Sequence, residues 1–574
     1  MKFFIGLTLF IASSLVSAQS LDVRWGEPIK TITEFSEIIG FSSDTLYLES
    51  DEIINPGVGA VLRKPALSAV STKSLEIIYT EQIKLPKVNG EKVELFDIIL
   101  LNKGLVALGF STNTSKTSMK VYGFPVSKNG NVNPQANLLL DISDNDAIIN
   151  QNVFIEFSKD KSKFILVYMR LAESSSEFRA ETIVYNSDVE LISTRSTSRV
   201  FLRKNKNKDL FNISILLNND GSYLTSVEET IFSKDKLPDY SFTIKEINEF
   251  GELEIEKTIR FNERGLYKPY MFFSEDGETF QVIGFYSDLN DVKLKLGGYS
   301  GIYSATVSTK TFEVLEKKIS PFSDEILAKV YSEKELKKQK KKGKGLPLSE
   351  NFKIRAVTPT LDDGFLIQAE YYSKVYSKYT GGQLDPKTTY QFGDVVVLKL
   401  SSNGEIEWEQ VLYKQQFSIY SVPVTKTNNY ATGTKGEGYS QVSYSPVSST
   451  TRTSAVYSFM DAFFKVDKEP RSLDYWSYVS FLGDEEFIIL FNDSKSHPAN
   501  DKNHKMHFSL KKYQVYKVTF DIISGEMKKE YVGLDVVPEN EVIEAGSSIK
   551  VSESEVVLVT YKKGYNRIGV VTIK

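Results

Sequence analysis

A short pattern of apolar and polar residues recurs along this chain: an apolar run, a polar turn centred on Asp or Gly, and a second apolar run. Asp and Gly tolerate the left-handed backbone that a tight hairpin turn requires, and the flanking apolar runs are typical of strands. Each copy therefore predicts a β-hairpin. The copies lie at residues 41–48, 99–106, 157–164, 217–224, 273–280, 360–367 and 481–488, with a degenerate copy at residues 551–556.

The spacing of these hairpins predicts the fold class. The turn residues Asp44, Lys103, Asp160, Asp220 and Asp276 lie 56 to 60 residues apart. A strand unit repeated at such a period indicates a β-propeller. Later intervals are longer, and the excess falls in two stretches of unusual composition, which we interpret as insertions. The prediction is an all-β propeller of eight blades with four antiparallel strands each, with seven blades as the alternative if the last partial repeat merges with the first.

A second hairpin per blade and a closed ring complete this prediction. The clearest outer hairpin, residues 393–408, has an apolar strand, an Asn-Gly turn and a strand that ends in Trp408. The last repeat has room for only residues 567–573 after its first hairpin, so residues 21–27 are expected to supply its fourth strand. Closure would protect sheet edges from aggregation. No linker divides residues 19–574, which predicts a single domain.

The first residues predict export. Residues 1–18 combine a basic start, a short apolar core and small residues before Ala18, as a signal peptide does. The mature chain is expected to be periplasmic or extracellular. It is not expected to span a membrane, because no later stretch approaches the roughly 20 apolar residues required. With no Cys, disulfides and thiolate catalysis are excluded. A net charge of −4 argues against a nucleic-acid partner; the oligomeric state is left open.

The first insertion, at about residues 323–345, is basic. Carboxylates come first and lysines last, an order that suits a helix dipole and predicts one helix from about Asp324 to Lys342. The helix is either a basic arm for an anionic partner or a solvated charged surface helix. Its basic patch consists of Lys337, Lys338, Lys340, Lys341 and Lys342.

The second insertion, at about residues 419–471, is rich in Ser, Thr, Gly and Tyr. Tyrosine with Ser and Gly can form an adaptable binding surface, because a rigid ring costs little entropy to fix. An aromatic rim for sugar rings or an extended peptide is one interpretation, and a loop or added hairpins is the other. The candidate rim residues are Tyr371, Tyr372, Tyr376, Tyr379, Tyr439 and Tyr444.

All three histidines of the chain, His497, His504 and His507, fall within eleven residues, near Asp493 and Asp501. Clustered imidazoles and carboxylates can hold a divalent metal. The spacing of His504 and His507 does not align ligands on a helix, so the alternative is a polar loop between strands.

No cofactor is predicted, although a divalent metal is possible. The acidic segment with Asp141, Asp144 and Asp146 lacks the spaced ligands and closing Glu of a calcium loop. The chain also lacks a Gly-x-Ser-x-Gly elbow, a phosphate-binding Gly-rich loop and a His-Glu-x-x-His motif.

Residues 363–372 and 393–408 carry a resemblance. The second segment contains Asp-x-x-Val-x-Lys-x-x-x-x-Gly-x-x-x-Trp, from Asp394 to Trp408. It is similar to repeats of many bacterial propellers, and the two segments together resemble secreted repeat propellers of Bacteroidetes-type bacteria. The resemblance covers one blade well and the others by turn pattern alone. It implies a propeller blade and no functional residues.

Two functions fit these observations. The first is a non-catalytic binding or assembly propeller of the bacterial cell envelope that recognises a protein or glycan. The alternative is a secreted hydrolase acting on glycan or peptide, with two Asp or Glu residues in the central channel. A pair of carboxylates roughly 5 to 10 Å apart would favour the enzyme.

Overall fold

The structure is a computed structural model of the 574-residue chain. It describes residues 21–30, 33–54, 62–112, 118–143, 148–172, 177–200, 211–231, 239–261, 264–274, 277–288, 298–331, 333–341, 347–377, 387–421, 477–497, 500, 512–532, 536–545, 548–552, 555–562 and 565–573.

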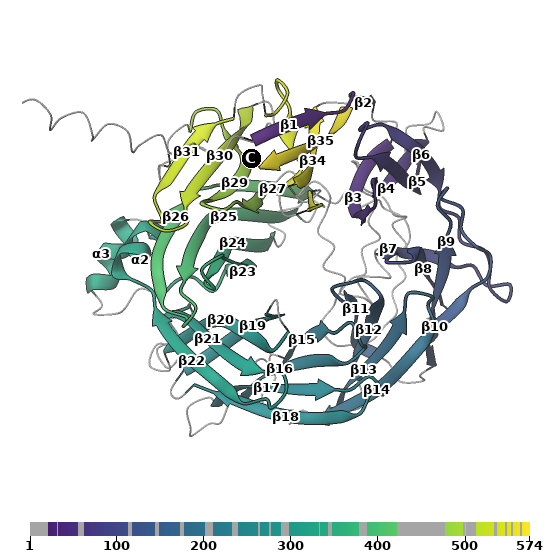
Figure 1. Ribbon diagram of the computed structural model, residues 1–574, viewed down its shortest axis with the longest axis horizontal. Coiled ribbons are helices and arrows are strands. Elements are labelled where there is room, and N and C mark those ends of the chain that lie inside the picture. The colour runs from purple at the N-terminus through teal and green to yellow at the C-terminus, as the bar shows by residue number, and fades with distance from the viewer. Residues whose placement is uncertain are drawn as a thin grey trace, which may run out of the picture.

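Eight antiparallel sheets are arranged in a ring, each with its first strand innermost (Figure 1). Blade 1 consists of β3 (Thr33–Ser42), β4 (Thr45–Ile54), β5 (Leu62–Ser71) and β6 (Ile77–Gln82). Blade 2 consists of β7 (Glu94–Leu101), β8 (Gly104–Thr112), β9 (Ser118–Val126) and β10 (Asn137–Ser143). Blade 3 consists of β11 (Ile148–Phe157), β12 (Lys163–Ala172), β13 (Glu177–Asn186) and β14 (Leu191–Val200).

The next four blades repeat this order. Blade 4 consists of β15 (Phe211–Leu217), β16 (Tyr223–Ile231), β17 (Asp239–Ile247) and β18 (Leu253–Arg260). Blade 5 consists of β19 (Arg264–Phe273), β20 (Thr279–Asp288), β21 (Gly301–Ser308) and β22 (Val314–Pro321). Blade 6 consists of β23 (Phe352–Pro359), β24 (Phe365–Ser377), β25 (Lys387–Leu400), β26 (Ile406–Leu412) and the added β27 (Gln416–Ser421). Blade 7 consists of β28 (Val479–Leu482), β29 (Glu486–Ser494), β30 (Tyr513–Asp521) and β31 (Met527–Tyr531).

Blade 8 joins the two ends of the described chain. Its inner strand is split into β32 (Val542–Ile543) and β33 (Ile549–Lys550), which both pair with β34 (Glu555–Lys562). Next comes β35 (Tyr565–Ile573), and β1 (Leu21–Trp25) is the outermost strand, with β2 (Ile29–Lys30) also pairing with β35. Leu21 pairs with Ile573 and Trp25 with Gly569. The prediction of eight blades and closure by the N-terminal strand is confirmed, and the alternative of seven blades is wrong.

The recurring turns of the sequence all join the first and second strands of a blade. Asp363 and Gly277 adopt the positive φ that such turns require, at 59° and 70°. The Asn-Gly turn at residues 403–404 likewise joins β25 to β26, as the outer hairpin predicted.

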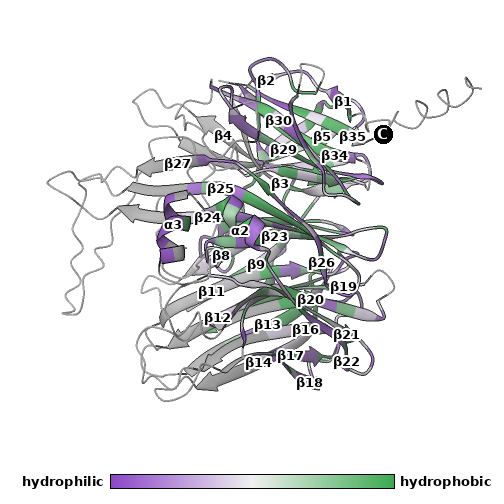
Figure 2. Cartoon of the chain, turned by 90° about the vertical axis from the view of Figure 1, so that its left-hand side faces the viewer, coloured by the Kyte–Doolittle hydropathy of each residue, from purple (hydrophilic) through white to green (hydrophobic). Residues whose placement is uncertain are grey.

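The central strands are buried on both faces because a blade lies on each side. In β29, Phe487, Ile489 and Phe491 pack with side chains of blade 6 such as Val397. The alternate residues of β29, such as Leu490, pack with blade 8. Successive side chains of a strand point to opposite faces, so one apolar strand serves two junctions. Figure 2 shows these apolar stretches inside the blades.

Turns between the third and fourth strands tie neighbouring blades together. In three of them a glycine adopts a φ of 70° to 82°. The carbonyl of each accepts a hydrogen bond from a polar side chain of the preceding blade: Gly251 from Nη1 of Arg195 (3.0 Å), Gly404 from Oγ of Ser320 (2.8 Å) and Gly525 from Nε2 of Gln410 (2.9 Å). The glycines of the repeat therefore serve both the turn and the contact between blades.

Successive strands of each blade run up and down, so their connections alternate between the two faces of the ring. Connections from first to second and from third to fourth strands have two to five residues, apart from residues 127–136. They lie on one side, which we call the tight-turn face. The remaining connections lie on the opposite side, the long-connection face. Figure 2 shows β25, β27 and helix α3 (Glu333–Lys341) on that side, at the left.

The basic insertion forms two helices where one was predicted. Ser323 caps α2 (Asp324–Val330) by accepting a hydrogen bond from the N–H of Ile326, and α3 follows. Tyr331 interrupts the helix because its backbone is extended (φ −89°, ψ 144°) and its hydroxyl donates to the carbonyl of Pro347. Among the described residues, no helix has the length and apolar character needed to cross a bilayer.

Closure can be tested at Gly569, which lies beneath Trp25. A Cβ at Gly569 would come within 2.4 Å of Cε3 of Trp25, whose Nε1 donates to the carbonyl of Val536 (3.0 Å). Gly569→Ala is therefore expected to displace the indole and to lower the free energy of unfolding by about 1–3 kcal/mol. Chemical denaturation followed by tryptophan fluorescence measures both effects.

A double-mutant cycle provides the control. In a Trp25→Leu background the same Gly569→Ala change is expected to cost less, because the colliding ring is gone. An equal cost in both backgrounds would contradict the packing of β1 on β35.

Candidate functional site

The predicted aromatic rim is described only in part. Tyr371 and Tyr372 are neighbours on β24, so they point to opposite faces of blade 6. Tyr371 packs edge-on against Phe352 (5.6 Å between ring centroids), and Tyr372 packs against Phe392 (5.2 Å). Each half-buried ring thus fills a different junction. The side chain of Tyr376, and residues Tyr379, Tyr439 and Tyr444 in full, lie outside the described residues.

The predicted basic patch lies mainly on α3. Lys337, Lys338 and Lys341 are exposed there, whereas the side chain of Lys340 and the whole of Lys342 lie outside the described residues. The structure brings these exposed lysines together on the long-connection face.

Helix α2 attaches α3 to the ring. Ile326 and Leu327 of α2 are buried in the apolar cluster between blades 5 and 6. The carbonyl of Lys329 accepts a hydrogen bond from the hydroxyl of Tyr413 (3.2 Å). The basic helix α3 therefore follows a helix that is packed firmly against blades 5 and 6.

The structure places His497 beside the buried ion pair of Asp493 and Lys529. Oδ2 of Asp493 lies 2.8 Å from Nδ1 of His497 and 2.7 Å from Nζ of Lys529, and all three side chains are at most 5% exposed. Nζ of Lys529 also lies 4.7 Å from the ring centroid of Tyr516. His504 and His507 lie outside the described residues, so the three-histidine metal site stays a prediction.

The acidic segment is also described only in part. Asp141 is exposed on β10 and lies 3.8 Å from Nζ of Lys120, whereas Asp144 and Asp146 lie outside the described residues. Within the described ranges, no group of three or more His, Asp or Glu side chains could hold a metal.

A second buried ionic group lies between blades 6 and 7, on the side of the long-connection face. We call Arg355, Glu370, Lys414, Gln416 and Ser477 the junction cluster. Arg355 comes from the inner strand β23 and Glu370 from β24, whereas Lys414 and Gln416 come from the chain around the start of β27. Ser477 lies just before β28. Glu370, Lys414 and Gln416 have no solvent exposure.

Glu370 is the centre of this cluster. Its Oε1 accepts a hydrogen bond from Nζ of Lys414, which also donates to Oε1 of Gln416 (3.1 Å). Its Oε2 accepts from Nε of Arg355 (3.0 Å) and from Oγ of Ser477 (2.8 Å). One buried carboxylate thus joins four segments of two blades, and breaking such a pair leaves an uncompensated buried charge.

The surroundings of Lys414 are aromatic. Its Nζ lies 5.8 Å from the ring centroid of Phe392 and 5.6 Å from that of Tyr478. Burial lowers the pKa of Lys414, and the charge of Glu370 opposes this shift. Burial also raises the pKa of Tyr478 well above its usual value. Solvent cannot reach Lys414, so its role is to hold Glu370 rather than to contact a ligand.

Sequence reasoning missed this cluster, although a signal was present. Leu366, Gln368, Glu370 and Tyr372 share one face of β24 by their spacing of two. The central strand of a blade is expected to be apolar on both faces, so Gln368 and Glu370 interrupt a core position twice. A polar pair at that spacing inside an apolar run is the pattern that could have revealed it.

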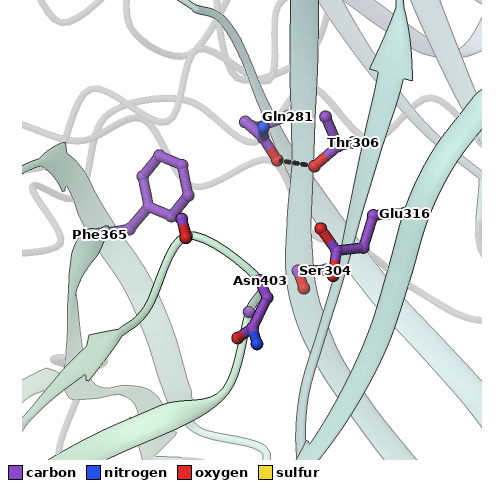
Figure 3. Close-up of a pocket in the computed structure, with 8 residues that line it drawn as sticks. Gln281, Ser304, Thr306, Glu316, Phe365 and Asn403 are labelled. Carbon is purple, nitrogen blue, oxygen red and sulfur yellow. Dashed lines mark hydrogen bonds between the residues drawn. The ribbon is translucent and has the colours of Figure 1, made fainter. Parts of the chain in front are cut away.

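A polar pocket lies between blades 5 and 6, next to the Asn-Gly turn (Figure 3). Thr306 donates to Oε1 of Gln281 (3.0 Å) on one side, and Asn403 and Phe365 face it from blade 6. Its volume of about 200 Å³ includes the solvent at its mouth. Small-ligand sites usually exceed about 300 Å³. We therefore assign the pocket to the packing of the turn.

The ion pair of Asp493 predicts a dependence of stability on pH. Burial raises the pKa of Asp493, but the contact with His497 and the charge of Lys529 outweigh it and hold the pKa below its usual value. Stability from a lowered pKa is present above the unfolded value of about 4 and is lost as the pH falls through the folded value. At neutral pH, Asp493→Asn is expected to cost about 3–5 kcal/mol, because Lys529 stays buried without its partner.

Urea denaturation between pH 7 and pH 3 measures the free energy of unfolding of both proteins. The difference between wild type and Asp493→Asn is expected to become smaller as the pH falls. Asp44→Asn is the control, because its pair with Lys73 is exposed (58% and 75%) and should contribute little. Wild-type stability of Asp493→Asn at neutral pH would contradict the ion pair.

No family model matches the chain, and no curated protein sequence matches it. Among solved structures, the WD40 domain of SCAP from fission yeast is similar over 96% of this chain and 98% of its own, at 10% identity and a TM-score of 0.33. Saccharomyces cerevisiae Sqt1 is similar over 95% and 98%, at 10% identity and a TM-score of 0.35. An α-L-arabinanase of Penicillium chrysogenum, complexed with arabinobiose, is similar over 60% and 94%, at 12% identity and a TM-score of 0.27. Likenesses at these values carry no argument about function, so the chain is described by its own architecture, an eight-bladed β-propeller.

Proposed function

We propose that this protein is a non-catalytic binding or assembly propeller of the bacterial cell envelope. It is exported by the segment at residues 1–18 and holds a protein or glycan ligand on the long-connection face.

The unequal faces of the ring are the observation that carries this proposal. The tight-turn face consists almost entirely of turns of two to five residues, several of which tie blades together. The long-connection face receives the two helices and the chain on both sides of residues 422–476. Binding residues of a rigid scaffold are usually carried by such connections.

The charge of α3 favours an acidic partner. Lys334, Lys338 and Lys341 are exposed, and α2 fixes the helix to blades 5 and 6 through its buried Ile326 and Leu327. A basic patch on a fixed support steers an oppositely charged partner toward one orientation.

A hydrolase is the second candidate function. The position and the raised pKa of Glu156 favour it. This residue lies on the inner strand β11 of blade 3. The pKa of Tyr270, on the inner strand of blade 5, is raised first by burial and then by the charge of Glu156. The side chain of Glu156 is exposed, but desolvation by the surrounding protein still raises its pKa, as suits a general acid. Hydrolysis of a glycan or peptide substrate that Glu156→Gln abolishes would favour this candidate.

Charge reversal on α3 tests the binding proposal. The triple variant Lys334→Glu, Lys338→Glu and Lys341→Glu is expected to lose a partner that wild type captures by cross-linking in a cell-envelope fraction. Each reversal replaces an attraction to an acidic surface by a repulsion. A glycan array with the same two proteins covers the case of a glycan ligand.

The matched control reverses three exposed lysines of the tight-turn face, Lys73, Lys103 and Lys310, with the same change in net charge. This control is expected to bind as wild type does. Equal loss by both triple variants would show non-specific charge attraction, and full binding by the α3 variant would remove α3 from the interface.

A further inference from the structure

Arg355 occupies an unusual position on the inner strand of blade 6. Ile354 pairs with Ala369 and Ala356 pairs with Gln368, so Arg355 is the unpaired residue of a β-bulge. Bulges redirect a side chain and often occur next to functional sites. The inner strand β7 of blade 2 has a bulge of the same kind, but its unpaired residue is the buried Phe96. Blade 6 thus aims a cation where blade 2 buries an aromatic ring.

The guanidinium of Arg355 is held on three sides. Its Nε donates to Oε2 of Glu370 (3.0 Å), a carboxylate with no solvent exposure. Its Cζ lies 5.3 Å from the ring centroid of Tyr372 and 5.9 Å from that of Phe392. Contacts of this kind fix the plane of the group, because arginine stacks on aromatic faces and binds carboxylates with a rigid fork.

The other edge of the guanidinium is available. Arginine has five N–H donors, and the contact with Glu370 uses the one on Nε. Within the described part of the chain, neither Nη atom of Arg355 has a hydrogen-bond partner, and 35% of the side chain is exposed. The exposed edge is therefore the one that carries the Nη donors.

Glu370 shares its negative charge between Arg355 and Lys414, so it does not neutralise Arg355 fully. Nζ of Lys414 donates to the other oxygen of the same carboxylate, so one negative charge serves two cations. Asp394 also attracts Lys414, and its Oδ1 accepts a hydrogen bond from the Lys414 backbone N–H (3.1 Å). The buried groups balance one another behind the guanidinium, which alone of the two cations reaches solvent.

Gln368 gives independent support for a polar role of this strand face. It lies two residues before Glu370, has no solvent exposure, and neither its Oε1 nor its Nε2 has a hydrogen-bond partner among the described residues. A buried polar group without a partner costs stability. Packing alone would favour an apolar side chain at this position.

We propose that Arg355 is an oxyanion-binding residue, whose Nη donors take the carboxylate, sulfate or phosphate group of a ligand at the inner end of the junction between blades 6 and 7. Planar two-oxygen groups match the spacing of the two Nη donors. The proposal rests on the binding function above for its biological meaning and deepens it by naming the chemistry of the ligand. It assigns Lys414 and Glu370 the role of positioning Arg355.

Protection from an arginine reagent tests this assignment in the full-length exported chain without any substitution. Phenylglyoxal modification of Arg355 is followed by peptide mass spectrometry in the presence of potassium glucuronate, inorganic sulfate or inorganic phosphate, each against chloride at equal ionic strength. At least one oxyanion is expected to slow modification of Arg355 several-fold. Arg24, an exposed arginine of β1, is the internal control and is expected to react at an unchanged rate.

The pattern of protection separates the sources of the anion. Strongest protection by glucuronate indicates an acidic sugar, and strongest protection by sulfate or phosphate indicates an esterified ligand. Equal rates with all three oxyanions and with chloride would overturn the proposal, and so would equal slowing at Arg355 and Arg24. No binding partner is present in this experiment. A negative result would therefore reject the role of Arg355 only, and the charge reversal on α3 would still test the binding function.

A conservative substitution provides a second readout. Arg355→Lys keeps the charge but loses the fork, so isothermal titration with the protective anion is expected to show binding at least ten-fold weaker than wild type, which corresponds to about 1.4 kcal/mol. A thermal-unfolding scan confirms that the variant is folded. If folded Arg355→Lys binds the anion as tightly as wild type does, a positive charge alone is sufficient. That result would overturn the proposal that the two Nη donors bind the anion.

Discussion

The ring depends on the pairing of β1 with β35. The apolar central strands have no solvent-facing side, so each blade needs a neighbour on both faces. An open array would leave two blades with an exposed apolar face and an unpaired edge, which favours aggregation. The outermost strand of blade 8 comes from the beginning of the described chain, and side chains reinforce it: Nη1 of Arg567 donates to the carbonyl of Gly26 at 3.0 Å. Closure therefore completes blade 8 and gives every blade a neighbour on both faces.

The junctions differ in what they bury. Most are apolar, whereas the junction between blades 6 and 7 includes the Glu370 cluster and blade 7 itself contains the Asp493 pair. Buried ionic groups are poor sources of stability compared with apolar packing, but they define geometry closely because each charge requires its partner. The polar part of this junction lies toward the long-connection face, where the apolar packing ends. The buried charges that fix the geometry of this junction therefore lie next to the face that we propose for binding.

The sequence was sufficient for the fold because the turns carry their own chemistry. Asp, Asn or Gly marked the turns of seven of the eight first hairpins, the first five of them at intervals of 56 to 60 residues, and residues 393–408 marked an outer hairpin correctly. The single helix predicted to Lys342 was interrupted, because the contact of Tyr331 with Pro347 depends on distant packing that no local propensity encodes. The junction cluster was missed for the same reason: Arg355, Glu370, Lys414 and Ser477 are up to 122 residues apart in the sequence. The prediction that grouped His497 with His504 and His507 stays untested, and among the described residues His497 lies beside Asp493 and Lys529.

The pairing of β1 with β35 also joins segments from the two ends of the described chain. Arg567 and Gly26, which meet at the closure, are 541 residues apart. The entropy of closing a loop grows only slowly with its length, so this separation is tolerable at equilibrium, but long-range pairing is slow to find. A chain that emerges from its N-terminus must keep its first strand unpaired until its last strand has appeared. During that interval β1 is an unpaired strand beside a nearly complete ring, and a chaperone that covers such a strand would protect the protein when it is most prone to aggregate.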